Sequence, residues 1–124
     1  MKEKEDLKVI TKSMELVKHS FILTSNTNRY PKKFRYSLVP RMQDLSMDIY
    51  ENLMEANRID IRTERSHRNK LQTKAITSSD KLLCYIDLSF QLNLLSKRSS
   101  EYWSKLVRDV KYMSIAWRKR DKTR

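Results

Sequence analysis

The sequence contains no glycine in its 124 residues, and it has only two prolines. A chain without glycine has no Gly-rich phosphate loop of the dinucleotide-binding or P-loop kind, because the backbone of those loops approaches phosphate where a Cβ would intrude. It also lacks the residue that most tight hairpins use for positive φ. With Pro31 and Pro40 as its only strong breakers, the chain is expected to be all-helical.

A single cysteine, Cys84, excludes a disulfide framework within the chain and a Cys-based zinc site. Cys84 lies in the apolar run Leu82-Leu83-Cys84-Tyr85-Ile86, so we expect a small buried hydrophobe in a reducing compartment. The N-terminus has no continuous apolar signal region, and no run approaches about 18 apolar residues. These absences predict a soluble, cytoplasmic protein without membrane contact.

Apolar residues recur at alternating spacings of three and four, which is typical of amphipathic helices. The first predicted helix covers residues 3–24. Its stripe, which we expect to face the core, consists of Leu7, Ile10, Met14, Val17 and Phe21.

Three further helices are predicted over residues 37–62, 66–95 and 99–118, with a basic tail over 118–124 that is expected to fray. Ser37 is the expected cap of the second helix and Ser99 or Ser100 that of the fourth. Short connections force neighbouring helices to run antiparallel. We therefore expect one domain over residues 1–124, an all-α, antiparallel up-down four-helix bundle.

No catalytic constellation is visible. Glu15 lies four residues before His19 and Glu64 lies three residues before His67, but neither histidine has a second histidine at such a spacing. The di-iron bundle signature needs Glu-x-x-His on two helices, and this chain has it only once, at Glu64-Arg65-Ser66-His67. We expect surface histidines, no metal, no cofactor and no enzyme activity.

Positive charge is abundant and unevenly distributed, with 27 Lys and Arg against 15 Asp and Glu. Residues 1–26 are nearly balanced and residues 37–56 are net acidic, so the excess lies around Pro31, across residues 58–74 and from residue 97 onward. Basic residues that neutralise phosphates release counterions, which gives salt-sensitive affinity for RNA or DNA. The expected nucleic-acid-binding residues are Arg29, Lys32, Lys33, Arg35, Arg58, Arg62, Arg65, Arg68, Lys70, Lys74, Lys105, Arg108, Arg118, Lys119 and Arg120.

Two alternatives stay open. The basic runs could be a solvated surface, or they could serve an acidic protein partner. Tyr30, Phe34 and Tyr36 interleave with the first basic cluster, where aromatic rings either stack on bases or pack beside a helix entry.

The segment Arg29-Tyr30-Pro31-Lys32-Lys33-Phe34-Arg35-Tyr36, the pair Ala56-Asn57 and the closing Trp117 followed by basic residues resemble the four-helix-bundle family of ribosomal RNA intervening-sequence proteins. More specifically, they resemble its Avd branch, the accessory variability determinant of diversity-generating retroelements. The resemblance covers about residues 5–120.

This resemblance implies a non-catalytic homopentamer that binds a reverse transcriptase and its template-repeat RNA, and that supports mutagenic cDNA synthesis. The basic motif of the family falls on Pro31, Lys32, Lys33 and Arg35, and its tryptophan falls on Trp117. Family members often have glycines just before this tryptophan, whereas this chain has Ser114-Ile115-Ala116, which places the geometry of the last helix in question.

Overall fold

A computed structural model describes residues 2–124, with side chains from Leu7 onward. Four α-helices follow one another along the chain: α1 (Lys2–Thr24), α2 (Leu38–Arg58), α3 (Arg65–Gln91) and α4 (Lys97–Asp121). A 3-10 turn, η1 (Lys32–Phe34), lies between α1 and α2. Residues 2–124 include no strand.

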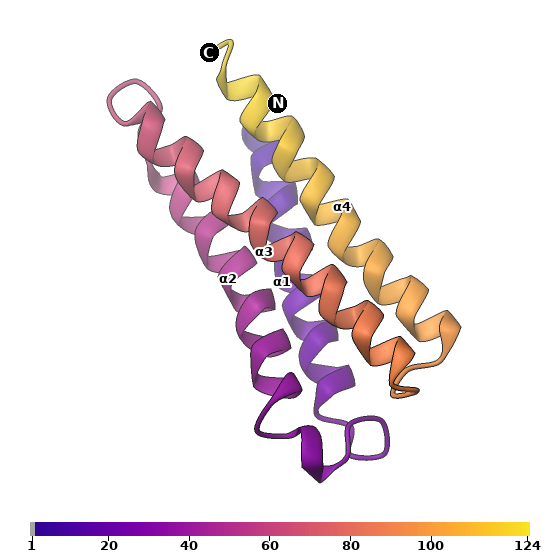
Figure 1. The fold of residues 1–124 in the computed structure, drawn as a ribbon. Helices are drawn as coiled ribbons and strands as arrows, with labels where there is room; N and C mark the ends of the chain where they lie inside the picture. The colour runs from indigo at the N-terminus through magenta and orange to yellow at the C-terminus, as the bar shows by residue number, and fades with distance from the viewer. Residues whose placement is uncertain (1) are drawn as a thin grey trace.

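The helices pack as an antiparallel bundle, which confirms the predicted fold class. α1 and α3 each pack against both α2 and α4. The two termini lie at the same end of the bundle as the α2–α3 connection, and η1 lies at the opposite end with the α3–α4 connection (Figure 1). We call these the termini end and the η1 end.

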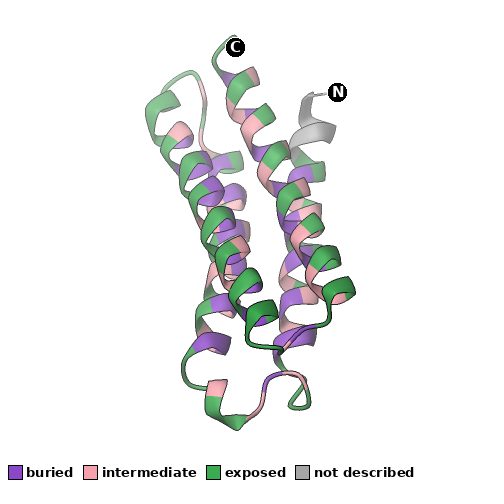
Figure 2. Cartoon of the chain, turned by 45° about the vertical axis from the view of Figure 1, so that its right-hand side comes forward, coloured by how far each residue is buried: buried purple, intermediate pink, exposed green. Residues whose placement is uncertain are grey.

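Buried residues lie on the inward faces of the helices, and exposed residues lie on the outward faces (Figure 2). Trp103 and Trp117 of α4, Ile49 of α2 and Leu82 of α3 are fully buried. Small serines complete the interface, and each of their hydroxyls is close to a carbonyl of the preceding turn. Ser20, for example, donates to Leu16 O at 2.8 Å. Because these hydroxyls are satisfied within their own helix, serine takes the close-contact positions that glycine or alanine often fills.

The inward face of α1 is not the predicted one. Leu7 is 55% exposed and Met14 46% exposed, whereas Val9 and Leu16 are buried. Ser13 and Ser20 are also buried on this face. Because serine is polar, an inward face that contains serines does not form a continuous apolar stripe in the sequence. The predicted stripe of larger apolar residues is therefore not the buried face of α1.

The connection between α2 and α3 also begins earlier than predicted, because Asp60 forms a turn. Its Oδ1 accepts from Arg62 N at 2.9 Å, and its carbonyl accepts from Thr63 N and Glu64 N. Such an aspartate competes with helical hydrogen bonds and ends the helix. α2 therefore ends at Arg58 rather than at residue 62.

α3 ends at Gln91 rather than at residue 95, because Asn93 adopts a left-handed conformation with φ 63°. Asn93 N donates to Phe90 O at 3.0 Å, and Leu94 N donates to Ser89 O at 2.9 Å. This is the Schellman termination, with asparagine in the position that glycine usually takes. A chain without glycine thus ends its longest helix with the next most tolerant residue.

Three smaller expectations need correction or completion. Ser37 does stand at the start of α2, but its side chain makes no capping bond. Ser96, not Ser99 or Ser100, caps α4, since its Oγ accepts from Ser99 N at 3.1 Å. Cys84 is exposed rather than buried, because Leu82 and Ile86 occupy the inward face of that turn.

α4 also extends beyond the predicted residue 118, so most of the tail is helical rather than frayed. The helix runs without interruption through Ser114-Ile115-Ala116, where the resembled family often has glycines. Ser114 is buried there, and its Oγ donates to Val110 O at 2.8 Å.

Candidate nucleic-acid interface

The fold gathers the predicted basic residues mainly at the two ends of the bundle. The second basic cluster and the tail both lie at the termini end, because α3 begins where α4 finishes (Figure 1). Residues 58–74 carry six Lys or Arg and two acids, and residues 118–124 carry five and one. Two separate runs in the sequence thus form one strongly basic end.

Direct contacts hold these two runs together. Arg118 Nη1 donates to Thr73 Oγ1 at 3.0 Å, and Arg65 donates to the carbonyl oxygens of Asp121 and Arg124. Between α3 and α4 lies a cleft of about 410 Å³ whose lining includes Arg65, Arg118 and Lys122. Cations near the last carbonyls of α4 also suit the negative end of its helix dipole.

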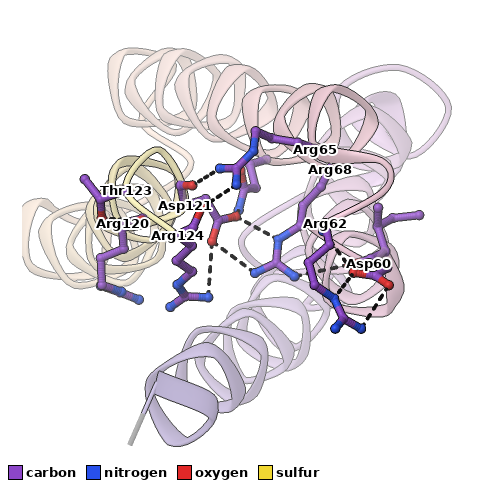
Figure 3. Close-up of polar contacts among 10 residues, drawn as sticks. Asp60, Arg62, Arg65, Arg68, Arg120, Asp121, Thr123 and Arg124 are labelled. Atoms are coloured by element: carbon purple, nitrogen blue, oxygen red, sulfur yellow. Dashed lines mark hydrogen bonds and ion pairs between the residues drawn. The ribbon is translucent and has the colours of Figure 1, made fainter.

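Arg68 does not belong to the exposed surface, in contrast to the prediction. It is 6% exposed, and its Nε and Nη2 donate to the carboxylate of Asp121 at 2.7 and 3.1 Å (Figure 3). Its guanidinium also lies 4.9 Å from the ring centroid of Trp117. A buried, fully engaged guanidinium is a structural connection between α3 and α4, so Arg68 leaves the list of candidate phosphate contacts.

The other predicted residues at this end reach solvent. Those that are exposed are Arg58, Arg62, Arg65, Lys70, Lys74 and Lys119, while Arg118 and Arg120 are half-buried. Arg62 is held near the surface by Asp60, with Nε to Oδ1 at 3.3 Å. The backbone hydrogen bond from Arg62, followed by its side-chain hydrogen bond, lowers the pKa of Asp60.

The first basic cluster lies at the η1 end. Lys32, Lys33 and Arg35 are exposed, and the half-buried Arg29 donates from Nη1 to Ser99 Oγ at 3.0 Å. This contact places the start of α4 beside the cluster.

Three further exposed cations lie at or near the η1 end: Arg41, which the sequence prediction omitted, and Lys97 and Arg98, which it placed in the last basic run and did not associate with the first cluster. The antiparallel order could have found Lys97 and Arg98, since it places the start of the fourth helix beside the first connection.

Lys105 and Arg108 join neither end. Both are exposed partway along α4, and Lys105 Nζ pairs with Asp109 Oδ2 at 3.1 Å. An exposed pair of this kind one turn apart is typical of a solvated helix face.

The three aromatic residues of the first cluster have different roles. Tyr30 is buried in the core, and this burial raises the pKa of its hydroxyl to about 12. Phe34 is half-buried, with Lys33 Nζ 5.2 Å from its ring centroid, and Tyr36 is 84% exposed. Tyr30 is therefore a packing residue, whereas the rings of Phe34 and Tyr36 are accessible for stacking on bases.

Neither His19 nor His67 lies in an arrangement typical of a metal site. His19 packs edge-on against Tyr102 and Trp103, with ring centroids 5.1 and 6.3 Å away. It is therefore half-buried, and the prediction of a surface histidine is wrong for this residue. His67 is exposed, as predicted. No group of three or more His, Cys, Asp or Glu side chains that could hold a metal is found among the described residues. Within that same part of the chain, no helix combines the length and apolar character needed to cross a bilayer.

Comparison with solved structures gives a close match in fold. A protein of unknown function from the S23 ribosomal protein family of Bacteroides thetaiotaomicron superimposes with a TM-score of 0.82. The match covers 93% of this chain and 98% of that one, at 14% identity. The two chains share a fold. No protein-family model and no curated protein sequence matches this chain.

Proposed function

We propose that this protein is a non-catalytic RNA-binding bundle that serves as the accessory subunit of a diversity-generating retroelement. The observation that carries RNA binding is the convergence of residues 58–74 and 118–124 on one end of the bundle. Phosphate contacts need several cations within reach of one backbone. The termini end offers these from two helices at once.

The retroelement assignment goes further than the fold. It rests on the resemblance of residues 29–36, of Ala56-Asn57 and of Trp117 with its basic successors to the Avd branch. In this proposal the chain forms a homopentamer in the cytoplasm, and it binds a reverse transcriptase together with the template-repeat RNA.

An apolar surface supports assembly of several copies. Leu7, Met14 and Ile22 of α1 are exposed, as are Tyr102 and Tyr112 of α4, the helix beside it. Leu7, Met14 and Ile22 recur every seven or eight residues and so lie along one side of α1, and an apolar surface that is contiguous in this way marks an interaction site, whereas scattered residues do not. Light scattering should then give five times the monomer mass.

RNA binding is tested by removing charge at the termini end. We expect the triple variant Arg58→Gln, Lys70→Gln, Lys74→Gln to bind structured RNA at least about tenfold more weakly in low salt. Its log–log salt slope should fall by about 2 to 3, since each lost phosphate contact is worth about 0.7 on a single strand and about 0.9 on a duplex. These three side chains are exposed, so the fold should survive.

A charge-matched control separates location from bulk charge. Lys18, Lys81 and Arg108 are also exposed but lie away from the termini end, on α1, α3 and α4. Changing all three to Gln should leave RNA affinity within about threefold. An equal loss in both variants would show that only net charge matters, and no salt-dependent binding by the wild type would remove the RNA-binding function.

The reverse-transcriptase partner needs its own test. Co-expression with a reverse transcriptase encoded beside this chain should yield a complex that survives gel filtration. The neighbourhood should also contain near-identical repeats that differ at adenines. Absence of both would leave an RNA-binding bundle unrelated to reverse transcription.

A protein-interaction bundle is the second candidate, and the charge on α2 favours it. Asp44, Asp48, Glu51 and Glu55 form an acidic helix surface opposite the buried stripe, and all four are exposed. Binding to a protein partner, with no affinity for RNA above that of another basic protein, would support this second candidate.

A further inference from the structure

A shallow groove at the η1 end combines apolar, aromatic and cationic side chains. It lies between the start of α2 and the end of α3 and has a volume of about 490 Å³. Its lining includes Phe34, Leu38, Arg41, Tyr85, Leu88 and Leu92. None of its lining residues is acidic.

Several large apolar side chains lie exposed in and beside this groove. Leu88 and Leu92 line it and are 39% and 44% exposed. Phe90, near the end of α3, and Tyr36, between η1 and α2, are also exposed. Leu88 and Phe90 lie outside the core on the last turns of α3, which ends at Gln91.

The cations around the groove identify the chemistry of its occupant. Lys32, Lys33 and Arg35 are exposed on and next to η1, and Arg41 lines the groove itself. Asp87 is the nearest acid along α3, and its Oδ2 accepts from Gln91 Nε2 at 2.6 Å. The rim is therefore positive, while the floor is apolar.

Single-stranded nucleic acid matches both properties. Its phosphates need cations, and its unstacked bases stack favourably on aromatic rings. A duplex offers the phosphates but hides the faces of its bases. An apolar protein segment would match the floor but would leave the cationic rim without counter-charges.

We propose that this groove binds the bases of single-stranded RNA, with the adjacent phosphates on Lys32, Lys33, Arg35 and Arg41. The inference rests on the proposed RNA-binding function and assigns a different kind of RNA contact to each end of the bundle. The termini end binds RNA through charge alone and accepts duplexes. The η1 end requires unpaired bases.

The test compares one oligoribonucleotide as a single strand and annealed to its complement. In the variant Phe34→Leu with Tyr36→Ser, side-chain rings are lost while charge is kept. We expect single-strand affinity to fall about tenfold, in line with the loss of one or two stacked bases, and duplex affinity to stay within about twofold. The control variant Tyr50→Leu removes a half-buried ring from the middle of α2, outside the groove, and should change neither.

A second readout does not depend on these substitutions. Cys84 is the only cysteine, is exposed, and lies one residue before Tyr85 and one turn before Leu88. A fluorophore on Cys84 should be quenched by a single strand that carries a terminal quencher, and not by the same strand in a duplex.

The outcomes distinguish the groove from the general function. If RNA binds but the Phe34/Tyr36 variant loses nothing, or loses single strand and duplex equally, the groove proposal is wrong while RNA binding stands. If the Cys84 label is quenched equally by the single strand and by the duplex, the groove does not require unpaired bases and the proposal is also wrong. If wild-type protein binds neither form of RNA, the proposed function itself fails.

Discussion

Arg68 Nε donates to Asp121 Oδ2 across 2.7 Å and joins the first turns of α3 to the last turn of α4. The same carboxylate accepts from Gln72 Nε2 at 2.7 Å, and Arg124 Nη1 lies 3.2 Å from its Oδ1 (Figure 3). Arg68 and Asp121 are both buried. This network fixes the termini end, where the exposed basic residues are presented.

We expect Asp121→Asn to lower the free energy of unfolding by about 3 kcal/mol, because it leaves the buried guanidinium of Arg68 without its carboxylate. Urea denaturation monitored by circular dichroism measures the change. Asp109→Asn is the control, since Asp109 forms an exposed pair with Lys105 that is worth about 0.5 kcal/mol or less. Similar small losses in both variants would contradict a stabilising role for the buried network.

The left-handed residue at the end of α3 gives a second prediction. Asn93 has φ 63°, a conformation that costs most L-residues about 1–2 kcal/mol and costs glycine almost nothing. Asn93→Ala should therefore lower the melting temperature, while Asn93→Gly should leave it unchanged or raise it. Equal melting temperatures for the two variants would show that the strain at this position has no energetic weight.

The two buried tryptophans of α4 give a third prediction. Trp103 Nε1 donates to Ser20 Oγ at 3.0 Å, whereas Trp117 Nε1 has no hydrogen-bond partner among the described residues. Trp103→Phe and Ser20→Ala should therefore be coupled by about 0.5–1.5 kcal/mol in a double-mutant cycle. Trp117→Phe combined with Ser20→Ala should be additive. Coupling in both cycles would point to a general repacking of the core instead of this hydrogen bond.

Much of the fold was predictable because apolar spacing is a local property. Along α2 and α4 the recurring apolar residues do mark the core: Met42, Ile49 and Leu53 are buried, as are Trp103 and Val110. The pattern failed on α1, where serines take the inward positions between Val9 and Leu23. The size of the side chain that fits at a helix contact depends on how closely the neighbouring helix approaches. The apolar pattern of one helix carries no information about that distance.

The sequence predicts which basic residues make up the candidate site, but it predicts only in part where they lie in the fold. Local sequence places Arg68 in a basic run, and only the packing of α4 against α3 brings Asp121 to it from 53 residues away. One signal was present, since Asp121 is the sole acid in the tail 118–124. The joining of two basic runs at one end likewise follows from the antiparallel order rather than from either run.

His19 gives the last prediction, a pH dependence of stability. Burial, and then the positive charge of Arg29, lower the pKa of His19 below its ordinary value of 6.5. As pH falls below 6.5, the unfolded chain takes up a proton that the folded chain does not, so the free energy of unfolding decreases until the folded pKa is passed. Raising the pH above 6.5 restores it.

Urea midpoints at pH 7.5, 6.5 and 5.5 measure this effect above the range in which most carboxylates titrate. We expect the wild type to lose stability over this interval, and His19→Gln to lose much less, because glutamine binds no proton. His67→Gln removes an exposed histidine that is outside the core and should keep the wild-type slope. If His19→Gln instead retains that slope and His67→Gln flattens it, the acid sensitivity arises at the start of α3 and not at the contact of α1 with Tyr102 and Trp103.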